Sequence, residues 1–267
     1  EGFVLSNTAG QPTIRLSNVT QISKRDATVS GSQEASDAAG KGSEMGHQMA
    51  LKSKVLKSDL EYIASGRQAR NDGEDTTPTA RTTEAIAHFI ARGKDRNNVS
   101  GAAVYGYTTG LPAVSTDAFA AVSAGNQVSM TETLVGDAMQ GAYTNGASPD
   151  LFVVPPAIKR TISTFQGRNS TQVLVGKTEV VATVDIIATD FGRLKVVPSR
   201  WIPTDISLIL DPDYLAFAFF RNFRQYQMAK TGDAETRMIL CEWGVEVRNP
   251  MAHVLFNGVK QGALLGD

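Results

Sequence analysis

The chain has 267 residues, of which 42% are hydrophobic and 20% are charged, so it can bury a sizeable core and is not of the disordered class. Its 26 basic and 27 acidic side chains give a formal net charge of -1, which excludes the basic excess typical of a dedicated nucleic-acid-binding domain. Near-neutrality also removes long-range self-repulsion, so copies of the chain can approach one another.

Apolar runs, the first residues and the cysteine content indicate where in the cell the chain is expected. No run approaches the ~20 apolar residues of a membrane-spanning helix, so no membrane partner is expected. The sequence opens on Glu1-Gly2-Phe3, with neither a signal peptide nor an initiator methionine, and we expect a chain that is processed, truncated or part of a longer one. The single cysteine, Cys241, lies in an apolar run; we expect a buried, unreactive thiol, as suits a reducing cytosol.

Residues 1–42 are expected to form an extended polar arm. Ile14, Leu16 and Ile22 share one parity of the sequence, as on a half-exposed strand. So few apolar residues cannot offset the entropy cost of ordering the arm, so we expect it to be ordered by something outside itself. A flexible tail is the alternative. Under both interpretations, removal of residues 1–33 is expected to leave a folded subunit. If the arm is ordered by something outside itself, we also expect that the shortened subunit does not assemble.

The first helix is predicted from Glu44 to Ser65. Ser43 is a candidate N-cap, and Gly66 is suited to end the helix. Between them, apolar residues recur at intervals of three, four or seven and form one stripe: Met45, Met49, Leu56, Leu60 and Ile63.

The middle of the chain is predicted to alternate loops and helices. Residues 66–80 form a polar loop, residues 83–91 a short helical patch, and residues 99–127 loops and short strands. A second helix is predicted to start at Ser129, because Ser129-Met130-Thr131-Glu132 matches a capping box, and to end at Gly146.

The second half of the chain is predicted to be mostly strand. A buried strand over 151–154 ends at Pro155-Pro156, which opens a short helix over 157–165. The remaining β-branched or alternating segments predict strands over 173–175, 180–187, 194–197, 206–210, 215–220, 236–247 and 252–256.

No catalytic, cofactor-binding or metal site is expected. The histidines His47, His88 and His253 are scattered and form no zinc-ligand spacing, and no nucleophile-elbow motif occurs.

Two glutamates on one predicted strand are the remaining candidates for acid–base chemistry. Glu242 and Glu246 would lie roughly 13 Å apart along the strand, too far for a retaining glycosidase pair and long for an inverting one. We interpret them as structural partners of Arg237 or Arg248.

The order of these elements, with five short strings in sequence, is more informative than any motif of chemistry. The strings are Asn18–Ile22 with Val29–Gln33 in the arm, Lys57-Ser58-Asp59-Leu60-Glu61 in the first helix, Leu151–Pro156, Gly192–Pro198 and Arg237–Pro250. In this order they resemble the major capsid proteins of tailed phages, whose fold also occurs in encapsulins and in the herpesvirus capsid floor. The resemblance covers residues 14–257.

The resemblance implies an α+β fold with an extended loop, a long spine helix, a peripheral domain and an axial domain. Residues 1–42 would be the extended loop that lies over a neighbouring subunit, and 43–128 the spine helix and part of the peripheral domain. Residues 129–227 would form the axial domain, whose tips meet at the centre of each ring of subunits. Residues 228–267 would return to the peripheral domain.

The implied function is that of a subunit that self-assembles, as hexamers and pentamers, into the icosahedral shell of a phage. The shell would enclose genomic DNA without sequence specificity, involve portal and scaffold or protease partners, assemble in the bacterial host cytoplasm and form the virion capsid. Proposed subunit-interface residues are Ile14, Leu16, Ile22, Lys24 and Arg25. The alternatives are an encapsulin-type compartment shell and an unrecognised enzyme or carbohydrate-binding β protein.

Overall fold

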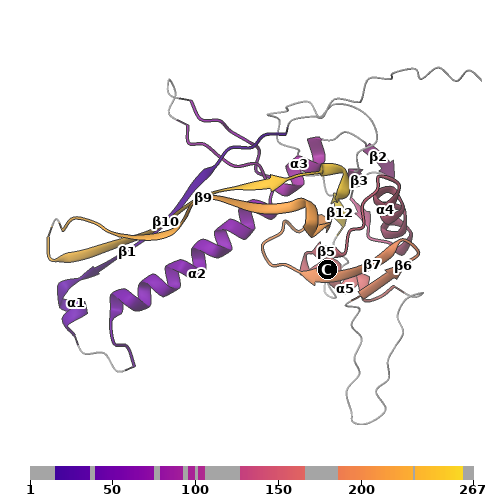
Figure 1. The fold of residues 1–267 in the computed structure, drawn as a ribbon. Helices are drawn as coiled ribbons and strands as arrows, with labels where there is room; N and C mark the ends of the chain where they lie inside the picture. The colour runs from indigo at the N-terminus through magenta and orange to yellow at the C-terminus, as the bar shows by residue number, and fades with distance from the viewer. Residues whose placement is uncertain are drawn as a thin grey trace, which may run out of the picture.

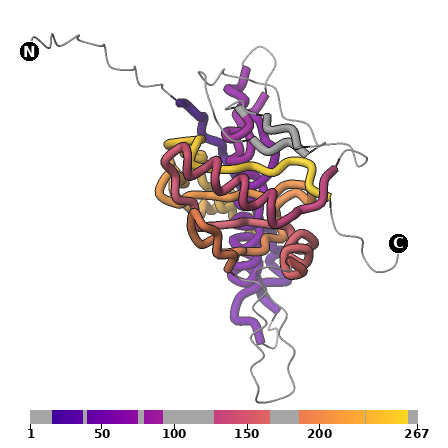
Figure 2. Tube along the Cα trace, turned by 90° about the vertical axis from the view of Figure 1, so that its right-hand side faces the viewer, coloured from indigo at the N-terminus to yellow at the C-terminus, as the bar shows by residue number. Residues whose placement is uncertain are grey.

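The computed structural model describes residues 16–36, 40–74, 79–92, 96–99, 102–105, 127–165, 186–230 and 232–260. These residues form two bodies, each built on one main sheet (Figure 1). The long-sheet body consists of a three-stranded sheet and the helix α2, and it extends away from the compact body, which contains a seven-stranded sheet. Seen from the right-hand side of Figure 1, the compact body lies in front (Figure 2). The α+β class is confirmed.

The long sheet is antiparallel, in the order β1-β10-β9. β10 (Ala234–Val247) is its central strand and is flanked by β1 (Gln21–Ser30) and β9 (Leu215–Gln227). The ladder between β1 and β10 runs without interruption from Gln21 opposite Trp243 to Ser30 opposite Ala234. β9 and β10 form a hairpin with register shifts around Glu242.

The helix α2 (Glu44–Ser65) covers one face of this sheet, and its predicted bounds are confirmed. The Ser43 hydroxyl accepts a hydrogen bond from the Gly46 amide at the N-terminus, and the Gly66 amide donates to the Ile63 carbonyl at the other end. The predicted stripe is the packed one: Met45 and Met49 are buried in one core cluster, Leu56 and Leu60 in another, and Ile63 packs against the second. Burial of this stripe holds helix and sheet together.

The arm differs from the expectation in three ways. Residues Gly31–Ala35 form a short helix, α1, rather than extended chain. The backbone of residues 21–30 pairs with β10, so the strand is ordered by a segment outside the arm, as expected, but that segment belongs to the same chain and not to a neighbouring subunit. The buried parity is also the opposite one: Ala27 and Val29 pack against the methionines of α2, while Ile22 is exposed. The arm strand is therefore part of the fold, and its removal should cost stability.

The compact body has a mixed sheet in the order β2-β3-β11-β8-β5-β7-β6. Neighbouring strands are antiparallel except β5 and β7. Their bounds are β2 Arg96–Val99, β3 Ala102–Tyr105, β5 Leu151–Val154, β6 Ile186–Thr189, β7 Gly192–Pro198, β8 Ile206–Leu210 and β11 Val254–Asn257. The helices are α3 (Ile86–Arg92), α4 (Glu132–Thr144) and α5 (Pro156–Ile162), with 3-10 turns at Pro212–Tyr214 and Pro250–Ala252.

The central strands β8 and β11 of this sheet are buried on both faces. Phe152, Ile209 and Phe256 point into one core with α4 and α5. Leu208 and Leu255, of the opposite parity, point into a second core shared with α2, α3 and β10. Alternate residues of the same strands thus join two separate cores, which explains the continuous apolar runs in the sequence.

Several boundaries differ from the predictions. The N-cap of α4 is Thr131, whose hydroxyl accepts from the Leu134 amide. Ser129, the predicted cap, instead lies in β4 (Val128–Ser129), which pairs in parallel with β12 (Val259–Lys260). Gly146 follows the end of α4 with a φ of 81°, as predicted for a C-terminal glycine.

The remaining differences concern element lengths and grouping. The helix α5 ends at Ile162 rather than at 165, and β9 continues to Gln227 rather than to 220. The predicted strand over 173–175 and most of that over 180–187 lie outside the described residues. The ranges 129–227 and 228–267 each contribute strands to both sheets, because β9 pairs with β10 and β11 pairs with β8.

Candidate subunit interface

The proposed interface residues lie around the arm strand and differ in their surroundings. Ile14 lies outside the described residues. Leu16 is half-buried and lines a groove of about 210 Å³ with Phe89 and Val247. Ile22 is 47% exposed, and Lys24 is exposed on the same face of β1. The structure therefore leaves Ile22 and Lys24 accessible to another molecule.

Arg25 points to the opposite face and contacts α2 of the same chain. Its Nε lies 2.7 Å from Oδ2 of Asp59, and both side chains are partly exposed. The hydrogen bond to Asp59 is the main cause that raises the pKa of the Arg25 guanidinium. This ion pair ties β1 to α2, and solvent screening keeps the contribution of such an exposed pair to folding small. In this structure Arg25 is an intramolecular contact.

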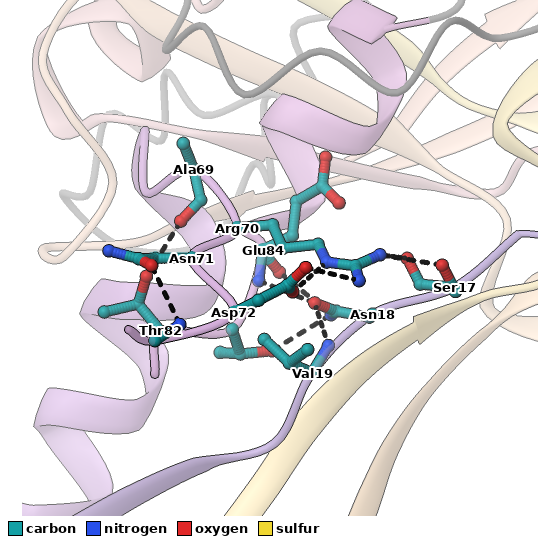
Figure 3. A network of polar contacts seen from close by, with 11 residues as sticks. Ser17, Asn18, Val19, Ala69, Arg70, Asn71, Asp72, Thr82 and Glu84 are labelled. Atoms are coloured by element: carbon teal, nitrogen blue, oxygen red, sulfur yellow. Dashed lines mark hydrogen bonds and ion pairs between the residues drawn. The ribbon is translucent and has the colours of Figure 1, made fainter. Parts of the chain in front are cut away.

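Asn18 anchors the start of the arm (Figure 3). Its Nδ2 donates to Oγ1 of Thr83 at 2.9 Å and to the Val245 carbonyl at 2.8 Å. Its Oδ1 accepts from the amides of Val19 at 2.8 Å and Glu84 at 2.9 Å. One side-chain amide thereby joins three segments that are far apart in the sequence.

The arm passes close to β10 beside this amide. A Cβ at position 244 would lie 3.3 Å from the Val19 carbonyl oxygen, so Gly244 leaves the space through which the arm runs. Asn18 belongs to one of the short sequence motifs that carry the family resemblance, but its contacts were not predicted from the sequence.

The loop between α2 and α3 holds the arm from the other side. Arg70 donates through Nη1 to the Ser17 carbonyl and hydroxyl, at 3.1 and 2.7 Å, and its other nitrogens make a bidentate contact with Asp72 (Figure 3). The loop itself is held by paired backbone hydrogen bonds between Asn71 and Thr82, at 3.1 and 3.0 Å. This arrangement orders residues 17–20 without a strand ladder.

Glu242 is the most connected carboxylate among the described residues of this region, and it is 4% exposed. Its Oε1 accepts from Thr20 at 2.8 Å and from Arg81 at 3.2 Å, and its Oε2 accepts from Arg221 at 2.7 Å. The pKa of Glu242 is held below its ordinary value, first by the hydrogen bond from Thr20 and then by the one from Arg221. The carboxylate therefore links arm, loop, β9 and β10.

The predicted partners of the two glutamates are half right. Glu246 pairs with Arg248 at 2.9 Å, as expected. Arg237 instead pairs with Glu235 at 2.6 Å, and the partners of Glu242 come from distant segments that spacing could not reveal.

The remaining ionisable groups of the core are arranged as structural residues. Cys241 is fully buried, as expected, and burial raises the pKa of its thiol to about 11. His253 Nδ1 accepts from the Asp211 amide at 3.1 Å, and burial lowers the pKa of His253 to about 4. Nδ1 of His88 lies 2.6 Å from Oε1 of Glu84. Within the described ranges, no group of three or more His, Cys, Asp or Glu residues could hold a metal ion.

No helix of the described part of the chain has the length and apolar character needed to cross a bilayer. Polar anchoring of the arm, rather than a cluster of reactive groups, distinguishes this region.

Comparison with known proteins gives a family match over nearly the whole chain. A family model described as SU10 major capsid protein matches residues 1–260. The major capsid protein of Escherichia phage Phieco32 is 27% identical over 274 residues, which cover 92% of this chain and 77% of that relative.

Solved structures with the same fold include shells of two kinds. The chain matches a capsid subunit of cyanophage A-1(L) with a TM-score of 0.62 at 13% identity, over 90% of this chain and 78% of that one. It matches the SrpI encapsulin of Synechococcus elongatus with a TM-score of 0.56 at 10% identity, over 91% and 75%. The procapsid of satellite phage P4 gives 0.55 at 12% identity, over 98% and 79%. The predicted fold, that of phage capsid subunits and encapsulins, is confirmed.

Proposed function

We propose that this chain, which belongs to the SU10 major capsid protein family, builds its shell from hexamers and pentamers. The chain is a major capsid protein of a phage, a structural subunit of the virion. Both the family model and the curated relative are phage capsid proteins, so an encapsulin-type compartment is the less supported alternative. The family match over residues 1–260 is the observation that carries this conclusion.

The two bodies would have different places in each ring of subunits. The long-sheet body, with α2 as the spine helix, would form the periphery, and the compact body would point toward the ring axis. The elongated shape supports this division, because the long sheet extends away from the compact body and offers surface to a neighbour (Figure 1).

The exposed arm residues would contact neighbouring copies. Ile22 and Lys24 are accessible on β1, and Leu16 lines a shallow groove beside it. Arg25 would contribute less, because its guanidinium already binds Asp59.

Other partners follow from the capsid role. The shell would enclose genomic DNA without sequence specificity, and the net charge of -1 is consistent with enclosure rather than tight binding. Assembly in the host cytoplasm would involve a portal and a scaffold or protease.

Expression of the chain in bacteria, with its scaffold or protease where one is required, tests the proposal. Electron microscopy and sedimentation should show closed particles of megadalton mass with six-fold and five-fold rings. A monodisperse monomer at tens of micromolar in every salt condition would contradict it.

A further inference from the structure

The two bodies meet where α2 ends. The helix runs along the long sheet and reaches the compact body at its C-terminal end (Figure 1). There Leu60 and Ala64 of the helix share a core with Leu208 and Leu255 of the compact sheet. The contacts made at this end of the helix therefore determine how the two bodies are oriented relative to each other.

The apolar contact between the helix and the compact sheet is open on one side. A groove of about 420 Å³ lies there, and its lining includes Leu60 and Ala64 of α2, Leu208 and Leu210 of β8, and Phe217 of β9. Apolar burial is non-directional, and only dense packing makes one orientation much better than its neighbours. Packing at this seam therefore holds the two bodies together without defining a single angle between them.

A polar cluster just after α2 supplies a directional contact. Nη1 and Nη2 of Arg67 donate to Oδ1 and Oδ2 of Asp205, at 3.0 and 2.6 Å, and Nη2 also donates to Oδ1 of Asn257 at 2.7 Å. The side chains of Arg67 and Asp205 are mostly buried, and Asn257 is fully buried. A bidentate contact between a guanidinium and a carboxylate restricts direction as well as distance. We call these three residues the polar junction.

Asp205 is itself held by the backbone of the compact body. It directly precedes β8, and its carbonyl accepts from the amides of Gly258 at 2.9 Å and Val259 at 3.1 Å. Asn257 is the last residue of β11, and Val259 is the first residue of β12. Arg67 therefore binds a point where three strands of the compact body converge.

A second polar contact lies farther back on the same helix. The Ser199 hydroxyl, just after β7, donates to Oε1 of Glu61 at 2.7 Å. The Ser199 amide donates to the Val154 carbonyl at 2.9 Å, so this residue is also held by the compact sheet. Contacts at separate points along the helix restrict rotation of one body against the other as well as their separation.

We infer that Arg67 is a positioning residue that, through Asp205 and Asn257, sets the angle between the two bodies and thereby the uniformity of the shell. This assignment rests on the proposed function, in which each subunit contacts its neighbours through both bodies. A heterologous interface closes into a ring only when the rotation between successive copies is right, so a change in this angle changes which rings form. Buried ion pairs add little net stability, but they can specify one arrangement among several. The polar junction contributes to the precision of assembly more than to the stability of the fold.

Arg67→Lys tests the inference with a small change. Lysine keeps the positive charge but cannot make the bidentate contact with Asp205. The variant should melt cooperatively, close to the unmodified chain by circular dichroism, and its shells should lose the single diameter and become a mixture of sizes and open fragments. Arg237→Lys is the matched control, because Arg237 pairs with Glu235 within β10 and joins no two bodies. Its particles should be as uniform as those of the unmodified chain by electron microscopy.

An apolar version of the polar junction separates positioning from stability. Arg67→Met, Asp205→Leu and Asn257→Leu together remove the directional contacts, and such a replacement of a buried polar cluster is often neutral or stabilising. A cooperative melt with a broad distribution of particle sizes is expected.

Uniform particles from either variant would overturn the inference. Loss of the cooperative melt in either would also overturn it, because the polar junction would then be required for folding. Absence of particles from the unmodified chain would instead contradict the proposed function, so the two failures are distinguishable.

Discussion

The two sheets of this protein differ in how completely the chain covers them. The sheet of the compact body lies between two cores, with Leu208 pointing into one and Ile209 into the other. The long sheet packs α2 on one face, and over its outer half the residues of the other face are partly exposed, with Tyr226 at 39% and Met228 at 47%. A sheet between two cores is buried within one chain, whereas an antiparallel sheet that packs a helix on one face can leave the other face accessible.

The largest difference in stability is expected when an aspartate is introduced into each sheet in turn. Leu208→Asp buries an unpaired carboxylate in the compact body, where Leu208 is 1% exposed, and should lower the free energy of unfolding by about 4 kcal/mol or more. Met238→Asp, on the accessible face of the long sheet, should cost about 1 kcal/mol or less. Urea denaturation measures both, and equal costs would remove the distinction between the two sheets.

Acid should weaken the compact body next. His253 has a folded-state pKa of about 4, below its ordinary 6.5, so the unfolded chain takes up a proton first as the pH falls. Stability should be intact above pH 6.5 and decline toward pH 4, by about 3 kcal/mol in total. The replacement His253→Asn keeps an acceptor for the Asp211 amide and should flatten this decline in pH-dependent thermal melts. An unchanged pH profile would contradict the assignment.

The arm anchor should contribute an intermediate amount. Asn18→Ala removes the side chain that joins Thr83, Glu84 and the Val245 carbonyl, and should destabilise the fold by about 2 kcal/mol. Hydrogen exchange should show faster opening of residues 17–21 while the compact body stays protected. Asn18→Asp keeps the acceptor oxygen and loses the amide donor. Its loss of stability is expected to lie between zero and that of Asn18→Ala. No change in exchange would mean that the ladder to β10 alone holds the arm.

The exposed ion pair between β1 and α2 should matter least. Arg25→Ala removes the contact with Asp59 and should leave the free energy of unfolding almost unchanged, with a still smaller effect in high salt. Arg25→Lys is the matched control, and chemical denaturation at two salt concentrations is the measurement. A cost of several kcal/mol would show that this pair, rather than packing, holds the arm on the helix.

Local patterns in the sequence predicted the helix α2 and the main strands well, because each carries its own signal. The stripe from Met45 to Leu60 has helical spacing, and Ser43 and Gly66 mark its ends. Prediction was weaker where pairing is long-range. Ser129 matched a capping box but pairs with Lys260 in a parallel bridge, so the cap moved to Thr131.

The candidate interface was predicted only in part for the same reason. Apolar parity in the arm indicated Ile22 as a contact residue, and the fold leaves it exposed, but the same parity gave no sign that Ala27 and Val29 pack on the methionines of α2. The contacts of Asn18 and Glu242 join residues more than two hundred positions apart, and no spacing rule reaches that far. The residue types of the arm indicated which side chains make contacts. The direction in which each side chain points could be read only from the structure.

Near-atomic electron microscopy of the assembled shell tests the central claim most directly. The account predicts closed particles in which β1 of each subunit pairs with its own β10. A shell in which β1 pairs with a neighbour's β10, or a chain that forms no closed particles, would contradict it.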